Sequence, residues 1–218
     1  MEILLVRHAE SEGNLRGVMQ GHVDYPLSDL GRQQAICVAD YLKAHFAALN
    51  PPDFFLASPL KRAFQTAETI AQALDIQTIP TDSRLIEVSS GIFSGLTWAE
   101  ALAQHPEVCA RFKQLGDWSA VPEGESREAL WLRARQFLES LIQSQQPKAR
   151  GVVVTHGGFI RALMGVVAGV APSENVFICI DNTSLSLIGI AGSRKYIRYV
   201  NRTQHLADCE FSPDFVPQ

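Results

Sequence analysis

A run of four apolar residues near the start of the chain, Ile3–Val6, ends directly in Arg7 and His8. A short, continuous apolar run of this kind predicts a strand that is buried on both faces of a sheet. Open α/β sheets bind their ligands in the crevice at the carboxyl ends of the strands. A permanently charged guanidinium and an ionisable imidazole at such an end therefore indicate a candidate reactive edge.

Two further apolar runs, residues 53–57 and 151–155, also end in polar or charged side chains. The residues of interest that follow them are Ser58, Arg62, His156, Gly157 and Gly158. In a parallel sheet the three carboxyl ends share one edge, so two guanidinium groups and two imidazoles would surround one point. Arginine binds phosphate oxygens with two N–H groups, and the N–H groups at a helix start add further donors. The pattern predicts a pocket for a dianion such as phosphate.

Segments with helical spacing of apolar residues separate these strands. We expect helices over 28–46, 59–74, 125–143 and 159–167 and one opening at Thr97, and further strands over 76–79, 184–190 and 196–200. Alternating strands and helices predict a three-layer α/β/α sandwich with a mostly parallel sheet. A turn at 191–193 predicts a final hairpin, which adds an antiparallel edge strand. Residues 82–125 are expected to form a small helical insertion within one domain, 1–218, and the segment after Leu206 is expected to be loose.

Composition excludes several classes of protein. With 218 residues, 46% of them hydrophobic, the chain can bury one substantial core. A net charge of −4 argues against a nucleic-acid-binding protein, which needs a basic surface. The longest apolar region, 159–171, contains Arg161 and is too short to span a bilayer, so we expect no membrane association. We also expect no secretion signal, because the N-terminus lacks a basic region followed by an apolar stretch.

The four cysteines, Cys37, Cys109, Cys179 and Cys209, are scattered along the chain. None forms a C-x-x-C pair, which argues against a thiolate metal site or a redox pair. Single cysteines suit the reducing cytoplasm, where we expect the protein to be located. The C-terminal hairpin could pair with a second copy at the sheet edge and form a homodimer.

Four motifs, in this order along the chain, resemble the histidine phosphatase superfamily, the phosphoglycerate-mutase-like group. They are Arg7-His8-Ala9-Glu10-Ser11 followed by Asn14, Ser58-Pro59-Leu60-x-Arg62-x-x-x-Thr66-Ala67, Glu87 with Gly91 and Gly95, and Thr155-His156-Gly157-Gly158. The resemblance covers most of the chain. It implies a histidine acid or neutral phosphatase that hydrolyses a small phosphorylated metabolite and needs no metal or other cofactor.

The resemblance also implies a role for each motif. His8 would attack phosphorus and become a phosphohistidine, and Glu87 would protonate the leaving alkoxide and later take a proton from water. Arg7, Arg62 and His156 would stabilise charge on the phosphoryl oxygens. Further candidates for binding phosphate or substrate are Asn14, Gln20, Gly21, Gly157, His22 and His205.

Several of these residues also have purely structural interpretations. Arg62 could be a solvated helix residue, and His156 could be a histidine with satisfied hydrogen bonds in a strand-to-helix turn. The residues after Glu87 differ from the family's usual aromatic-Gly pattern, so Glu10 and Glu12 compete with it for the acid role.

His205 could simply be an exposed histidine near the C-terminus. Trp98, Phe112 and Trp118 are expected to pack the insertion, although contact with substrate is the alternative for them.

Three other functions are alternatives to hydrolysis. A mutase would shield its phosphoenzyme from water and carry a basic cluster in the insertion, of which Arg111 and Lys113 are a reduced version. An inactive phospholigand-binding relative would usually lack the nucleophile or a phosphate-binding residue, and none is missing here. A zinc or two-metal phosphatase would show H-x-H or H-x-x-x-H spacing, which the sequence lacks. Residues 88–118 should select the leaving group, with phosphoglycerate, phosphoserine, α-ribazole phosphate and sugar phosphates as candidates.

Overall fold

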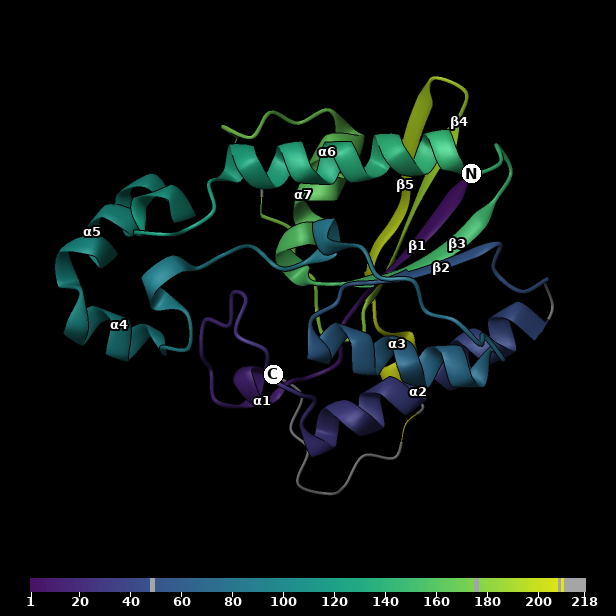
Figure 1. Cartoon of the computed structure of the whole chain (residues 1–218), viewed down its shortest axis with the longest axis horizontal. Helices are drawn as coiled ribbons and strands as arrows, with labels where there is room; N and C mark the ends of the chain where they lie inside the picture. Colours follow the sequence, from purple (N-terminus) through teal and green to yellow (C-terminus); the bar gives the residue numbers. More distant parts are fainter. Residues whose placement is uncertain (48–49, 175–176, 208, 210–218) are drawn as a thin grey trace.

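One five-stranded sheet crosses the centre of the computed structural model, which describes residues 1–47, 50–174, 177–207 and 209 (Figure 1). Its strands are β1 (Glu2–Arg7), β2 (Phe54–Ala57), β3 (Arg150–Thr155), β4 (Leu185–Ala191) and β5 (Arg194–Arg202). They lie in the order β2-β3-β1-β4-β5. β1, β2 and β3 run parallel, whereas β4 and β5 are antiparallel to their neighbours. The predicted mostly parallel sheet and its antiparallel hairpin at one edge are confirmed.

The central strand β1 is buried on both faces, as its apolar sequence predicted. Ile3 and Leu5 belong to the hydrophobic cluster on one face of the sheet, whereas Leu4 and Val6 belong to the cluster on the opposite face. None of the four side chains is more than 6% exposed. This alternation follows from the two-residue repeat of a strand.

Helices cover both faces of the sheet and complete the three predicted layers (Figure 1). Helices α6 (Arg127–Ser144) and α7 (Gly157–Ala168) contribute to the core on one face, and α2 (Asp29–Ala47) and α3 (Lys61–Ala73) to the core on the other. Apart from the helices of the insertion, the other elements are short: α1 (Glu12–Leu15), α8 (Gln204–Ala207) and the 3₁₀ turns η1 (Ser83–Leu85), η2 (Gly91–Phe93) and η3 (Trp118–Ala120). Helix α7 begins directly after β3, so its N-terminus lies at the carboxyl edge of the sheet.

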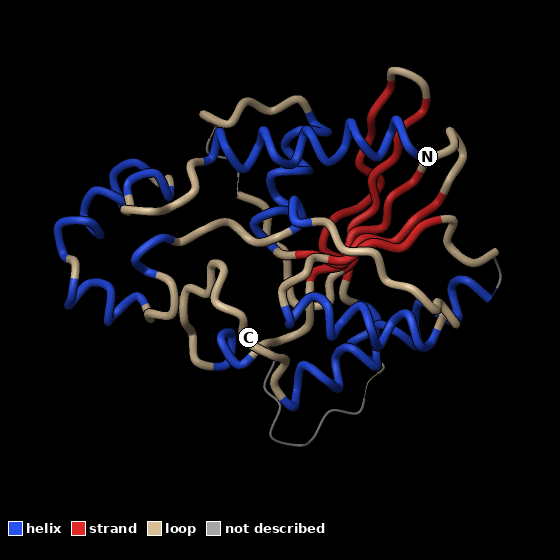
Figure 2. The backbone as a smooth tube through the Cα atoms, viewed as in Figure 1, coloured by secondary structure: helices blue, strands red, loops and turns tan. Residues whose placement is uncertain are grey.

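The insertion forms a small helical lobe beyond the sheet (Figure 2). It contains α4 (Trp98–Gln104) and α5 (Pro106–Leu115), and α4 opens at Thr97 as predicted, where Thr97 and Glu100 form a capping box. Phe112 lies 5.9 Å from the ring of Trp98 and 4.6 Å from that of Trp118, centroid to centroid. The expectation that these three aromatic residues pack the insertion is confirmed.

The lobe is joined to the loop that follows α1. Met19 N donates to Leu96 O (2.8 Å), and Gly95 N donates to Met19 O (2.8 Å). The Met19 side chain also packs against the apolar core of the lobe. The segment around Met19 and the lobe therefore share both a backbone pairing and a small core.

Residues 76–79 do not form the predicted strand. Asp75, in a left-handed backbone conformation with φ of 56°, ends the turn after α3, and the chain meets β2 only at a bridge between Ala57 and Thr81. Pro80 has no N–H group with which to extend a ladder. The apolar residues of this segment instead pack under α3, where Ile76 and Ile79 join the core.

The cysteines differ from the prediction. Cys37 of α2 and Cys209 form a disulfide, while Cys109 and Cys179 are free. The interpretation of all four as single thiols was wrong for this pair, and it no longer supports a cytoplasmic location. The expectation of a loose segment after Leu206 falls largely on residues 208 and 210–218, which lie outside the described residues. Among the described residues, no helix is long and apolar enough to cross a membrane.

Candidate active site

The carboxyl ends of the three parallel strands lie level at one edge of the sheet. Arg7 of β1 pairs with Thr155 of β3, and Ala57 of β2 pairs with Val154 of β3. Beyond β1, the backbone N–H of His8 still donates to Thr155 O (2.9 Å). The register of the sheet therefore brings together the three motifs that the sequence placed at strand ends.

The imidazole of His8 is held in one tautomer by its own loop. The ring is 2% exposed, and Nδ1 lies 2.7 Å from Ala9 O. A carbonyl oxygen only accepts hydrogen bonds, so Nδ1 carries the proton and Nε2 keeps its lone pair in the neutral ring. Burial, and then the positive charges of Arg7 and Arg62, hold the pKa of His8 well below its usual value. His8 thus presents a neutral, unprotonated Nε2, as a nucleophile requires.

The backbone around His8 is held by residues that the sequence did not identify as functional. Asn182 Nδ2 donates to His8 O (2.9 Å), and Thr183 N donates to the same oxygen (3.3 Å). On the other side, Ala9 N donates to Thr66 Oγ1 (3.0 Å). Polar residues directly before β4 were the only signal in the sequence for the first two contacts.

His156 lies beside His8, with the ring centroids 5.1 Å apart. It is fully buried, and its Nε2 lies 2.7 Å from Ser58 Oγ. When the Ser58 hydroxyl donates to Nε2, Nδ1 carries the proton and can donate to an anion. Burial lowers the pKa of His156 well below its usual value, as do the charge of Arg62 and the proximity of His8.

Two arginines complete the group, Arg7 half-buried and Arg62 buried. Arg7 Nη1 donates to Ile180 O (2.5 Å). Arg62, which is 1% exposed, donates from Nη1 to Val23 O (3.0 Å) and from Nη2 to Gly21 O (2.9 Å). The interpretation of Arg62 as a solvated helix residue is therefore wrong. Its guanidinium binds the backbone of the 21–23 loop and keeps three N–H groups for other partners.

Three buried nitrogen atoms at this site have no hydrogen-bond partner within the described part of the chain. They are Arg7 Nε, Arg62 Nε and His156 Nδ1. Buried polar atoms without partners are rare in proteins, and each one is destabilising when left so. Unpartnered N–H donors on two guanidinium groups and an imidazole are what the oxygens of a phosphoryl group require.

Glu87 reaches the site from the segment after η1. Its Oε1 accepts from Val88 N (2.9 Å), and its Oε2 accepts from Gly158 N (3.2 Å) at the start of α7. A Cβ on Gly158 would lie 2.3 Å from Glu87 Oε1, so a side chain at this position would displace the Glu87 carboxylate. The competing carboxylate of Glu10 is instead bonded to Ser28 Oγ (2.6 Å).

The loop candidates lie at the rim of this site with partners of their own. Asn14 Oδ1 accepts from Ser11 N (3.1 Å), and Gln20 Oε1 lies 2.7 Å from Ser11 Oγ. Gly21 is placed by its bond to Arg62, and the exposed His22 donates from Nε2 to Glu87 O (2.8 Å). Their binding roles stay predictions, since these contacts are all within the protein.

Gly157 lies under the Arg7 guanidinium, where a Cβ would be 3.5 Å from Arg7 Nε. His205 is placed differently from the other candidates. It is 4% exposed, and its Nε2 lies 3.0 Å from Thr183 Oγ1. His205 is thus neither exposed nor grouped with the catalytic candidates, and it reaches the backbone of His8 only through Thr183.

His205 should make stability depend on pH. Burial lowers the pKa of His205 from 6.5 to about 4, so the unfolded chain binds more protons than the folded one between these values. We therefore expect the free energy of unfolding to fall as the pH drops from 6.5 towards 4. In His205→Gln, urea unfolding at several pH values should show a smaller fall, because His8 and His156 still contribute but this group does not. Equal slopes in the two proteins would contradict the prediction.

The described residues contain no group of three or more His, Cys, Asp or Glu side chains arranged to hold a metal ion. The guanidinium groups of Arg7 and Arg62 lie close enough to His8 for their charges to lower its pKa, and permanently positive groups favour a bound anion over a metal cation. This donor set suits an anion.

The chain is similar to known proteins both in its sequence and in its fold. The family model of the histidine phosphatase superfamily (branch 1) matches residues 3–203. Phosphoserine phosphatase 1 of Hydrogenobacter thermophilus is 34% identical over 208 residues, which cover 95% of this chain and 95% of that protein. The metal-independent phosphoserine phosphatase of Arabidopsis thaliana is 29% identical over 211 residues, which cover 96% and 85%.

Among solved structures, that of mycobacterial glucosyl-3-phosphoglycerate phosphatase complexed with VO3 superposes with a TM-score of 0.80. It is 27% identical in sequence and covers 93% of this chain and 99% of that one. Residues 3–203, which the family model matches, contain all four motifs on which the resemblance was based. The chain belongs to branch 1 of the histidine phosphatase superfamily.

Proposed function

We propose that this enzyme hydrolyses a small phosphomonoester in two steps, with the phosphoryl group carried in between on Nε2 of His8. The observation that carries the proposal is the 2.7 Å contact between His8 Nδ1 and Ala9 O, which leaves Nε2 unprotonated in a buried neutral ring. The three unpartnered nitrogen atoms of Arg7, Arg62 and His156 supply donors for the phosphoryl oxygens.

In the first step Nε2 of His8 forms a bond to phosphorus as the bond to the ester oxygen breaks. Glu87 gives its proton to the leaving alkoxide, and each of its oxygens has a lone pair beyond the one bound to a backbone N–H. In the second step water attacks the phosphohistidine, Glu87 takes a proton from that water, and inorganic phosphate leaves. The cationic side chains neutralise the developing charge, so the chemistry needs no metal ion.

Phosphoserine is the substrate that we propose first. A phosphoserine phosphatase of Hydrogenobacter thermophilus matches along 95% of this chain, and the metal-independent enzyme of Arabidopsis thaliana matches along 96% of it. A glucosyl-3-phosphoglycerate phosphatase shares the fold, so a phosphorylated glycerate is the second candidate. Comparison of kcat/KM across phosphomonoesters would rank them.

The phosphoenzyme provides the direct test. With ³²P-labelled phosphoserine and an alkaline denaturing quench, we expect label on the protein that is acid-labile and maps to the peptide containing His8. The label should turn over to inorganic phosphate, and full activity should survive an excess of EDTA. A denatured protein without label during active turnover, or label on another residue, would overturn the proposed intermediate.

A further inference from the structure

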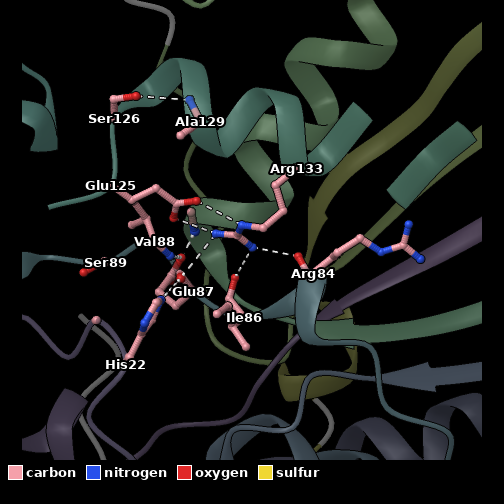
Figure 3. Close-up of polar contacts among 12 residues, drawn as sticks. His22, Arg84, Ile86, Glu87, Val88, Ser89, Glu125, Ser126, Ala129 and Arg133 are labelled. Carbon is pink, nitrogen blue, oxygen red and sulfur yellow. Dashed lines mark hydrogen bonds and ion pairs between the residues drawn. The ribbon is translucent and has the colours of Figure 1, made fainter. Parts of the chain in front are cut away.

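Arg133 lies outside the group described above, yet its guanidinium is bonded around the segment that carries Glu87 (Figure 3). Nε and Nη2 donate to the two carboxylate oxygens of Glu125, at 3.0 and 2.7 Å. Nη1 donates to Arg84 O (2.7 Å) and Ile86 O (2.8 Å), and Nη2 also donates to Glu87 O (3.4 Å). A guanidinium has five N–H groups, and each of the five has an acceptor here.

The surroundings of Arg133 and Glu125 make this a fixed arrangement. Their side chains are only 15% and 17% exposed, so their paired charges are well shielded from water. The Arg133 guanidinium also lies 5.5 Å from the ring centroid of Phe159, in the first turn of α7. Arg133 therefore contacts both the segment before Glu87 and the helix whose N-terminus bonds the Glu87 carboxylate.

The backbone of Glu87 is bound from two sides. Arg133 Nη2 donates to the Glu87 carbonyl oxygen from α6, and His22 Nε2 donates to the same oxygen from the 21–23 loop at 2.8 Å (Figure 3). The side chain is in turn bound by Val88 N and Gly158 N. The position of the carboxylate is therefore set by a chain of contacts in which Arg133 is the only charged donor among the described residues.

We propose that Arg133, paired with Glu125, is a positioning residue that places the Glu87 carboxyl group for proton transfer to the leaving group. All five N–H groups of Arg133 are bonded within the protein, so none is left to bind the phosphate or the substrate. The inference rests on the proposed role of Glu87 as general acid. It predicts that loss of Arg133 matters most when the leaving group needs a proton, because a misplaced acid is costly only there.

The test compares leaving groups of different basicity. In Arg133→Gln we expect kcat/KM for phosphoserine to fall about 10- to 100-fold, in keeping with a poorly placed general acid. For p-nitrophenyl phosphate, whose leaving group departs without a proton, the fall should be less than about threefold. Arg135→Gln, an exposed arginine on the same helix, is the matched control and should leave both values unchanged. Equal losses with both substrates would show a merely structural role and overturn the proposal.

A second variant covers the case in which Arg133→Gln does not fold. Arg133→Lys keeps the charge opposite Glu125 but cannot serve five acceptors, because an ammonium has three N–H groups. It should show the same difference between the two substrates at a smaller magnitude. Circular dichroism and thermal unfolding would confirm that the variants compared are folded.

A double-mutant cycle separates this inference from the function on which it rests. If Arg133 acts through Glu87, Arg133→Gln should have less than about a threefold effect on phosphoserine turnover in a Glu87→Gln background. Losses that multiply in the double variant would overturn the proposal and leave the acid role of Glu87 intact. A Glu87→Gln enzyme with full activity towards phosphoserine would instead overturn the acid role, and the positioning role with it.

Discussion

Replacing His8 with asparagine is expected to lower kcat for phosphoserine hydrolysis by at least about 10⁴-fold, as loss of a covalent nucleophile does in other enzymes. An asparagine Nδ2 can still donate to Ala9 O, as His8 Nδ1 does, so the loop should keep its conformation. What is lost is the unprotonated Nε2. Phosphate release measured at enzyme concentrations high enough to detect the residual rate would check the value.

The matched control is His45→Asn, which changes an exposed histidine in the last turn of α2 that is not among the site residues. It should have wild-type kcat and KM. The His8→Asn protein should also bind inorganic phosphate, because its cationic donors are unchanged. Turnover within tenfold of wild type in the His8 variant would rule out this residue as the nucleophile.

The second large effect is expected at Arg62. The Arg62 guanidinium donates to Gly21 O and Val23 O and also holds a buried Nε–H. In Arg62→Lys, the single ammonium nitrogen cannot occupy all three donor positions at once. Loss of one preorganised donor typically costs about 10²- to 10³-fold in kcat. We expect a loss at the upper end of this range, because the 21–23 loop also loses its anchor.

This prediction concerns geometry rather than charge, which the lysine retains. Arg32→Lys provides the comparison, since Arg32 is an exposed residue of α2 paired with Asp29 and should tolerate the change. Steady-state kinetics with phosphoserine and inhibition by vanadate would separate transition-state binding from substrate binding. An Arg62→Lys enzyme with near-normal kcat would show that only the positive charge of this residue matters.

The sequence predicted the reactive edge because two strong regularities coincide there. Apolar runs such as Ile3–Val6 identify buried strands, and parallel strands deliver their carboxyl ends to one edge. The sequence therefore predicted that the side chains of His8, Arg62 and His156 lie near one another, although none of their contacts was known. The order of the motifs then led to the family that the comparisons confirm.

Features that depend on tertiary packing could not be predicted in the same way. The disulfide joins Cys37 and Cys209 across 172 residues, and no local spacing signals such a pair. Whether 76–79 pairs with β2 depends on the direction of the chain after Asp75, and the five acceptors around Arg133 come from two separate segments. Residue patterns identify which side chains lie at strand ends but not which distant partners hold them.

The backbone pairing of Met19 with Gly95 and Leu96 links the loop after α1 to the helical lobe, so a change of conformation in one is transmitted to the other. We predicted that the lobe selects the leaving group and that Asn14, Gln20 and Gly21, in the loop joined to it, help to bind phosphate. Because the lobe and this loop share backbone hydrogen bonds, we expect that exchanging the lobe for that of a relative would also shift the loop. We therefore expect grafts that transfer residues 14–21 together with the lobe to retain more activity than grafts of the lobe alone.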